Sequence, residues 1–302
     1  MKNNKTHADI IESASITSLM RFLLSGKNEK VPNPDAYGKY FVNGKWKEFL
    51  HNVDKSKTEM QKKLPGCLYY HLIRTLKFDE SLKKWLGSHK DSQILILGAG
   101  FDSRSMRFSQ ELNATGIILF EVDLKAMLDF KLNIIKKYNL QTNNQYYQVP
   151  CNFNDQKLIN CFKEYKVSSQ KPTLILWEGV TYFLPESVIK TVLEELRNYF
   201  DSELQITLDY AYRDYIDGNL NYYGAKELYD ILIEINEPHF FGLNFDESEH
   251  FFKQLSFNTK ENLSAMMLES KFLRDNFGQS VGLPHVFNAM ADITSNKQEN
   301  VC

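Results

Sequence analysis

The stretch QILILGAGFDSR, residues 93–104, decides the fold that we expect for this chain. Its apolar run, Ile94 to Leu97, has the length of a buried strand and ends at Gly98 and Gly100. Glycine reaches backbone angles that other residues avoid and lets a ligand approach the main chain closely. A strand that runs into a glycine turn and then a helix is a common way to hold a nucleotide. The stretch therefore predicts a nucleotide-binding turn.

Further apolar runs repeat this texture along the chain. They are GIILFEVD (116–123), TLILWEG (173–179) and LQITLDYA (204–211). A further strand is expected at QYYQ (145–148), ending in VPCNFND (149–155). Apolar residues recur at helical spacing between the runs, at Leu124, Leu128, Leu132 and Ile135 and again at Ile189, Val192, Leu193 and Leu196. Apolar strands that alternate with amphipathic helices predict an α/β fold with a doubly wound, mostly parallel, Rossmann-like sheet.

The chain divides by composition into two expected parts. Residues 1–90 read as an N-terminal helical cap, and residues 91–302 read as the nucleotide-binding domain. A segment at about 212–250 is aromatic-rich and broken by glycine and proline, and we expect a helical insertion there that covers the substrate. Six aromatic residues are expected to form an apolar wall around the substrate: Tyr212, Tyr215, Tyr222, Tyr223, Phe240 and Phe241.

Composition excludes several classes of protein. The 302 residues carry a net charge of −2, which does not favour nucleic-acid binding. No run approaches the roughly 20 apolar residues of a membrane helix, and the N-terminus lacks the apolar core of a signal peptide. The four cysteines form no CxxC pair, which suits a reducing compartment, so we expect a cytoplasmic protein. The seven histidines show no metal-ligand spacing, and we expect no metal.

The glycine turn alone leaves the nucleotide open. The dinucleotide fingerprint G-x-G-x-x-G requires a third glycine, and Ser103 stands in its place. Glu121 and Asp123 follow about twenty residues later on one face of a strand, where a carboxylate can accept hydrogen bonds from ribose hydroxyls. Enzymes that use NAD and enzymes that use S-adenosylmethionine share this arrangement.

Four motifs in order resemble the leucine carboxyl methyltransferase family. They are LGAGFDSR (97–104), FEVD (120–123), CNFND (151–155) and WEGVTYFLP (177–185), against family patterns of approximately LGAGLDTR, FEVD, DLRD and AEGLLxYL. PDAYGKYF (34–41) and IRTLKFDE (73–80) also resemble N-terminal segments of the family, and the likeness covers roughly residues 10–300. The family includes polyketide-associated bacterial O-methyltransferases that depend on S-adenosyl-L-methionine. The resemblance thus implies a class I methyltransferase fold.

The resemblance implies a role for the turn and for the acids after the second strand. Gly98 and Gly100 would let the backbone approach the methionine part of the cofactor. Asp123, with Glu121 beside it, would bind the ribose. Ser103 replaces a threonine of the family and is expected to cap the following helix.

The remaining motifs would complete the cofactor site. Asn152 and Phe153, which replace Asp and Leu of the family, would border the adenine. Glu178 would lie near the methionine amine or the sulfonium, where a carboxylate stabilises positive charge. Arg74 resembles the arginine that binds the cofactor's carboxylate, and Tyr182 could position the methyl acceptor.

The resemblance implies an S-adenosyl-L-methionine-dependent O-methyltransferase, with a carboxyl group on a small-molecule or carrier-bound substrate as the favoured acceptor. A hydroxyl acceptor stays open, with His239, His250 or His285 as the general base. The sequence also leaves open an NAD-dependent oxidoreductase and a cofactor-binding subunit without catalysis. It predicts no oligomeric state.

Overall fold

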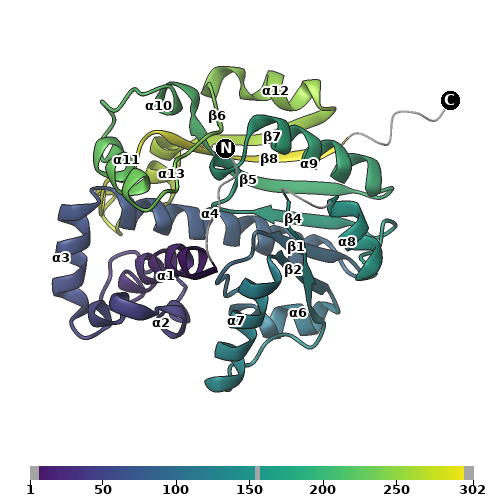
Figure 1. Ribbon diagram of the computed structural model, residues 1–302, viewed down its shortest axis with the longest axis horizontal. Helices are drawn as coiled ribbons and strands as arrows, with labels where there is room; N and C mark the ends of the chain where they lie inside the picture. Colours follow the sequence, from purple (N-terminus) through teal and green to yellow (C-terminus); the bar gives the residue numbers. More distant parts are fainter. Residues whose placement is uncertain (1–6, 154–156, 296–302) are drawn as a thin grey trace.

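An eight-stranded sheet forms the centre of the protein (Figure 1). This computed structural model describes residues 7–153 and 157–295, so Asn154 and Asp155 of the third motif, Cys302 and the end of the expected second domain lie outside it. The strands are β1 (Gln93–Leu97), β2 (Ile118–Asp123), β3 (Tyr146–Pro150), β4 (Thr173–Trp177), β5 (Leu204–Tyr212), β6 (Gly242–Leu243), β7 (Phe257–Ser264) and β8 (Asn288–Ser295).

The strand order confirms the predicted sheet. It runs β3-β2-β1-β4-β5-β8-β7, and β6 pairs with β5. Strands β1 to β6 pair in parallel, whereas β8 lies antiparallel between β5 and β7. The chain order reverses at β1, which lies between β2 and β4. Ligands of such sheets bind outside the carboxyl ends of the strands at this switch point, because the loops diverge there.

Helices cover both faces of the sheet. On β1, Leu95 and Leu97 point to one face and Ile94 and Ile96 to the other, as strand geometry requires. The first face packs against α8 (Leu158–Glu164), α9 (Glu186–Tyr199) and α12 (Ser248–Gln254). The second face packs against α4 (Cys67–Ser88), α6 (Ser109–Thr115) and α13 (Ala265–Phe272). Two short helices, α5 (Arg104–Arg107) and η2 (Thr181–Phe183), follow β1 and β4, and α7 (Lys125–Lys137) follows β2.

The N-terminal part is helical, as predicted. It contains α1 (His7–Leu23), α2 (Gly38–Phe41), η1 (Gly44–Leu50) and α3 (Val53–Lys63) before α4. Figure 1 shows α1, α2 and α3 grouped at one end of the sheet, beside α4.

The expected insertion forms a helical segment between β5 and β7. It consists of α10 (Arg213–Ile216), α11 (Ala225–Glu234), β6, η3 (Phe245–Glu247) and α12. Helix α11 is preceded by Gly224, whose φ of +75° favours glycine. A Cβ atom there would lie 2.0 Å from the Pro65 carbonyl oxygen, so this glycine lets α11 pack against the start of α4.

Candidate active site

The glycine turn after β1 depends on two glycines. Gly98 and Gly100 have φ values of +64° and +44°, which other residues rarely adopt. A Cβ atom on Gly98 would lie 2.4 Å from Cγ2 of Val180, a contact that a real side chain could not make. The Gly98 amide donates to the Val122 carbonyl oxygen at 2.8 Å. The turn therefore lies tightly between the ends of β2 and β4, and its backbone borders a cavity.

Asp123 fixes the turn from the end of β2. Its Oδ2 atom accepts a 2.6 Å hydrogen bond from the Gly100 amide, and its Oδ1 atom accepts one of the same length from the Leu124 amide. Burial raises the pKa of Asp123, and these two amide donors oppose that rise. The side chain borders the cavity.

Glu121 lies elsewhere, contrary to the sequence-based expectation. Its carboxylate is fully buried and pairs with Lys131 Nζ at 2.6 Å, and Tyr146 donates to the same oxygen at 2.8 Å. Glu121 does not border the cavity. Strand parity correctly put it on the same face as Asp123, but a lysine of α7 occupies its carboxylate. Asp123 is thus the acid of this strand that reaches the site.

Glu178 is held between two arginines at the end of β4. Its Oε1 atom lies 3.1 Å from Arg74 Nε, and its Oε2 atom lies 2.8 Å from Arg104 Nη1. Burial alone would raise the pKa of Glu178, but the charges of Arg104 and Arg74 lower it to about 2. Glu178 is therefore an anion at neutral pH on the wall of the cavity.

Arg74 links Glu178 to the other half of the cavity. Its Nη1 atom donates a 2.8 Å hydrogen bond to the Tyr182 hydroxyl and lies 3.6 Å from Oδ2 of Asp209. Tyr70 donates to Asp209 at 3.1 Å. Gly179 has a φ of +72°, and a Cβ atom there would lie 3.2 Å from Arg74 Nη1. The guanidinium is buried and borders the cavity, so it is not a solvent-facing helix arginine.

Asp209 is a buried acid beside Arg74 and Tyr70 that the sequence analysis missed; it contacts these two cavity residues but does not border the cavity itself. It is fully buried on β5, and burial raises its pKa to about 6, although Arg74 opposes that rise. The sequence feature that could have identified Asp209 is its position as an acid within the apolar run LQITLDYA. Arg104 was missed as well: it pairs with Asp79 and Asp102 in addition to Glu178.

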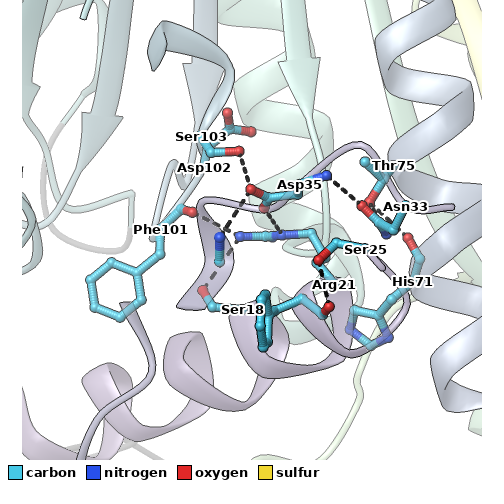
Figure 2. Close-up of polar contacts among 12 residues, drawn as sticks. Ser18, Arg21, Ser25, Asn33, Asp35, His71, Thr75, Phe101, Asp102 and Ser103 are labelled. Carbon is cyan, nitrogen blue, oxygen red and sulfur yellow. Dashed lines mark hydrogen bonds and ion pairs between the residues drawn. The ribbon is translucent and has the colours of Figure 1, made fainter. Parts of the chain in front are cut away.

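The N-terminal segment is tied to the glycine turn by a buried network (Figure 2). Arg21 of α1 donates to the Phe101 carbonyl oxygen and to Asp35 Oδ2, both at 2.7 Å. Ser103 donates to the other oxygen of Asp35, also at 2.7 Å. The expected helix cap by Ser103 is therefore wrong, and Asp102 accepts the Arg104 amide instead. The network places α1 over the turn.

The third motif lies beside the turn. Asn152 and Phe153 follow β3, and both border the cavity. The Cys151 amide donates to the Asp123 carbonyl oxygen at 2.9 Å, which fixes this segment next to the end of β2. The structure thus brings together Gly98, Gly100, Asp123 and both motif residues on one side of the cavity.

The cavity has a volume of about 570 Å³, within the range of small-molecule sites. Its second half is formed by residues of α4 and α11, by Glu237 and His239, and by the chain before β8. The expected wall of six aromatic residues is wrong, because none of them borders the cavity. Four aliphatic residues of the insertion take their place: Leu228, Ile231, Leu232 and Ile235.

Two of the three histidines considered as bases border the cavity. His239 packs against the Tyr182 ring, with centroids 4.4 Å apart, and burial lowers the pKa of His285 to about 3. His250 lies on α12, hydrogen-bonded to Gln254, and does not border the cavity.

Within residues 7–153 and 157–295, no three His, Cys, Asp or Glu side chains converge as metal ligands. No helix in those ranges is both long and apolar enough to cross a membrane.

Comparison with known sequences gives a consistent picture. Residues 14–197 match the family model of leucine carboxyl methyltransferase. A candidate S-adenosyl-L-methionine-dependent methyltransferase of Mycobacterium avium is 24% identical over 200 residues, which cover 62% of each chain. A similarly described protein of Frankia alni is 28% identical over 125 residues, 41% of this chain and 42% of that protein. The chain therefore matches less than two thirds of the length of these relatives.

Solved structures support the fold over most of the chain. A candidate methyltransferase from Thermobifida fusca has a TM-score of 0.60 and 16% identity, and the match covers 93% of this chain and 94% of that one. A DUF574 family protein from Streptomyces avermitilis has a TM-score of 0.61 and 11% identity, with 93% and 97% covered. At these identities the likeness bears on the fold alone.

Proposed function

Because this chain belongs to the leucine carboxyl methyltransferase family, we propose that it transfers the methyl group of S-adenosyl-L-methionine to a carboxylate. The acceptor would be a small molecule or an acyl group on a carrier. The observation that carries the proposal is the position of Arg74, which contacts Glu178 on the cofactor side and Tyr182 on the acceptor side.

The residues at the turn fit this cofactor. At Gly100, which borders the cavity, a Cβ atom would meet nothing nearer than 3.9 Å, so the backbone there is open to a ligand. Glu178 is anionic and matches the positive charge of the cofactor's ammonium and sulfonium groups. Asp123 offers carboxylate oxygens for the ribose, while Asn152 and Phe153 offer an amide and a ring for the adenine.

Tyr182 would align the acceptor, while Arg74 would hold the carboxylate of the cofactor. S-adenosyl-L-methionine supplies a methyl group that is already activated on sulfur. A carboxylate is ionised at pH 7 and needs no general base, so the protein has to align it and exclude water. The Tyr182 hydroxyl accepts a hydrogen bond from Arg74, so its own hydrogen can be donated to the acceptor carboxylate. Both side chains are buried, which keeps water away from the reacting atoms.

A hydroxyl acceptor is the second candidate, because His239 borders the cavity next to Tyr182. A neutral imidazole there could take the proton that a hydroxyl loses. An NAD-dependent oxidoreductase is less well supported, since Ser103 at the third glycine position is engaged with Asp35. A cofactor-binding subunit without catalysis would bind the cofactor and transfer nothing.

The test is transfer of a radiolabelled methyl group to a panel of carboxylic acids and alcohols. Treatment with base releases labelled methanol from a methyl ester but not from a methyl ether. We expect base-labile product from acids, and at least tenfold less from a Glu178→Gln variant, which keeps the side-chain shape without the charge. A base-stable product would favour a hydroxyl acceptor. Cofactor binding without any labelled product would favour a subunit without catalysis.

A further inference from the structure

We infer that Asp209 is a positioning residue for the cofactor, because it orients the Arg74 guanidinium so that its Nη2 atom is presented to the carboxylate of the cofactor's amino-acid tail. The inference rests on the role that the proposed function gives to Arg74. Asp209 is fully buried on β5, one position beyond the last pair of β4 and β5, Trp177–Leu208. It does not itself border the cavity, so it would act through its neighbours.

The Arg74 guanidinium is engaged by the protein on one side and open on the other. Its Nε atom donates to Glu178 at 3.1 Å, and its Nη1 atom donates to the Tyr182 hydroxyl at 2.8 Å. Nη1 also lies 3.6 Å from Oδ2 of Asp209. Within the part of the chain that the structure describes, no hydrogen bond involves Nη2. Since Arg74 borders the cavity, the two N–H groups of Nη2 are the ones left for a ligand carboxylate.

Both carboxylate oxygens of Asp209 fix the surroundings of Arg74. Oδ1 accepts a 2.8 Å hydrogen bond from the Gly179 amide, and Oδ2 accepts one of 3.1 Å from the Tyr70 hydroxyl. Gly179 lies in the loop after β4, whereas Tyr70 and Arg74 lie on α4. One buried carboxylate therefore ties this loop to the helix that carries Arg74.

Tyr70 and Gly179 are also the residues that flank the guanidinium. The Cζ atom of Arg74 lies 5.4 Å from the centroid of the Tyr70 ring, a cation–π contact. A Cβ atom on Gly179 would lie 3.2 Å from Nη1 and 3.3 Å from Nη2, so this glycine leaves room for the guanidinium. Loss of the contacts made by Asp209 would therefore release Arg74 on both sides.

An asparagine cannot replace the Asp209 carboxylate in these contacts. Burial raises the pKa of Asp209 to about 6, so at pH 8 it is an anion whose two oxygens only accept hydrogen bonds. Asparagine has a similar size, but one of its two terminal atoms is an NH2 donor. Whichever way this amide turns, its donor faces either the Gly179 amide or Nη1 of Arg74. The substitution should therefore displace the guanidinium.

The experiment compares two ligands that differ in the amino-acid tail. S-adenosylhomocysteine carries the carboxylate, whereas 5′-methylthioadenosine has the same adenosine and sulfur without the tail. Both are titrated by calorimetry at pH 8 into the parent protein and into Asp209→Asn. We expect Asp209→Asn to bind S-adenosylhomocysteine about five- to tenfold more weakly, as the loss of a hydrogen bond allows. Its affinity for 5′-methylthioadenosine should change less than about twofold, which also reports that the variant is folded.

Glu121→Gln is the matched control. Glu121 is also a fully buried acid that contacts a cation, Lys131, and a tyrosine hydroxyl, and it does not border the cavity. Both ligands contain the ribose, so the ratio of the two affinities should stay at the parent value in this variant.

Tyr70→Phe tests the same arrangement from α4. It removes the hydroxyl that donates to Asp209 and keeps the ring beside Arg74. We expect the preference for S-adenosylhomocysteine over 5′-methylthioadenosine to fall about two- to fivefold. This variant carries the test if Asp209→Asn does not fold, and an unchanged preference in it would overturn the inference.

Three further results would overturn the inference. The first is an equal loss of affinity for both ligands in Asp209→Asn, which a structural role alone would give. The second is an unchanged or higher affinity of that variant for S-adenosylhomocysteine. The third is a parent protein that does not prefer S-adenosylhomocysteine over 5′-methylthioadenosine. Failure of the proposed function looks different, because the expected affinities are then found but no methyl ester forms.

Discussion

The Nη1 atom of Arg74 donates a 2.8 Å hydrogen bond to the hydroxyl oxygen of Tyr182, 108 positions further along the chain. The same guanidinium pairs with Glu178. One buried side chain of α4 therefore contacts both the residue that follows β4 and a residue of η2. Arg74 therefore links Glu178, which we propose to lie at the cofactor, to Tyr182, which we propose to lie at the acceptor. The two proposed roles can be separated by mutation.

Tyr182→Phe should impair the acceptor side and spare the cofactor side. The variant loses the hydroxyl that contacts Arg74, while Arg74 keeps Glu178. A hydrogen bond to a charged group contributes about 1.5–3 kcal/mol, so kcat/KM for a methylated acid should fall about ten- to a hundredfold. S-adenosylhomocysteine affinity, measured by calorimetry, should change less than about twofold. Tyr215→Phe is the control, because no hydrogen bond to the Tyr215 hydroxyl exists among the described residues. A comparable loss of cofactor affinity in Tyr182→Phe would remove Tyr182 from the acceptor side.

Asp123→Asn should weaken cofactor binding in a folded protein. The amide keeps one oxygen for the turn but loses the charge that would bind the ribose, and the expected loss of affinity for S-adenosylhomocysteine is about ten- to a hundredfold. The control is the double variant Glu121→Leu, Lys131→Met, which replaces a buried ion pair by apolar side chains. It should bind with nearly the parent affinity. If the double variant loses as much affinity as Asp123→Asn, both acids belong to the ribose site after all.

Gly98→Ala should destabilise the fold as well as the site. The φ of +64° costs alanine about 1–2 kcal/mol, and the contact with Val180 adds strain. Gly87→Ala is the matched control, because Gly87 lies in α4 and a Cβ atom there would meet nothing within 4 Å. Urea unfolding should show a loss for Gly98→Ala and a gain of about 0.5–1 kcal/mol for Gly87→Ala. Equal effects from the two substitutions would mean that the turn is not strained.

Asp209→Asn should change how stability depends on pH. Burial raises the pKa of Asp209 from 3.8 to about 6, so between these values the folded protein holds a proton that the unfolded chain has lost. The folded state therefore loses stability from Asp209 as pH rises through this window, by about 3 kcal/mol in all. The Asp209→Asn variant has no carboxyl group at this position, so its folding stability does not decrease in this way as the pH rises. Relative to the parent protein, its free energy of unfolding should rise from pH 4 to pH 6.5. Urea unfolding at several pH values measures the difference, and a difference that stays constant would mean that Asp209 titrates normally.

The sequence was sufficient for β1, β2, β4 and β5, because each of these strands lies in a largely apolar run, and for β3, which precedes the third motif. It was not sufficient for the antiparallel edge, where β8 lies between β5 and β7, because a local pattern does not give the direction or order of a strand. In the site, local patterns pointed to Asp123 and Glu178. The fate of Glu121 depends on Lys131 of α7, and the network of Arg21 and Asp35 depends on tertiary contact with the glycine turn. Such pairings are set by packing and leave no local pattern.

The most direct test of the account is calorimetry with S-adenosylhomocysteine and with NAD on the same preparation. Gly98, Asp123 and Glu178 surround one side of a single cavity, and the third glycine that a dinucleotide needs is replaced by Ser103, which bonds to Asp35. The account predicts saturable binding of S-adenosylhomocysteine at one site and no detectable heat from NAD. Saturable NAD binding without a response to S-adenosylhomocysteine would contradict it.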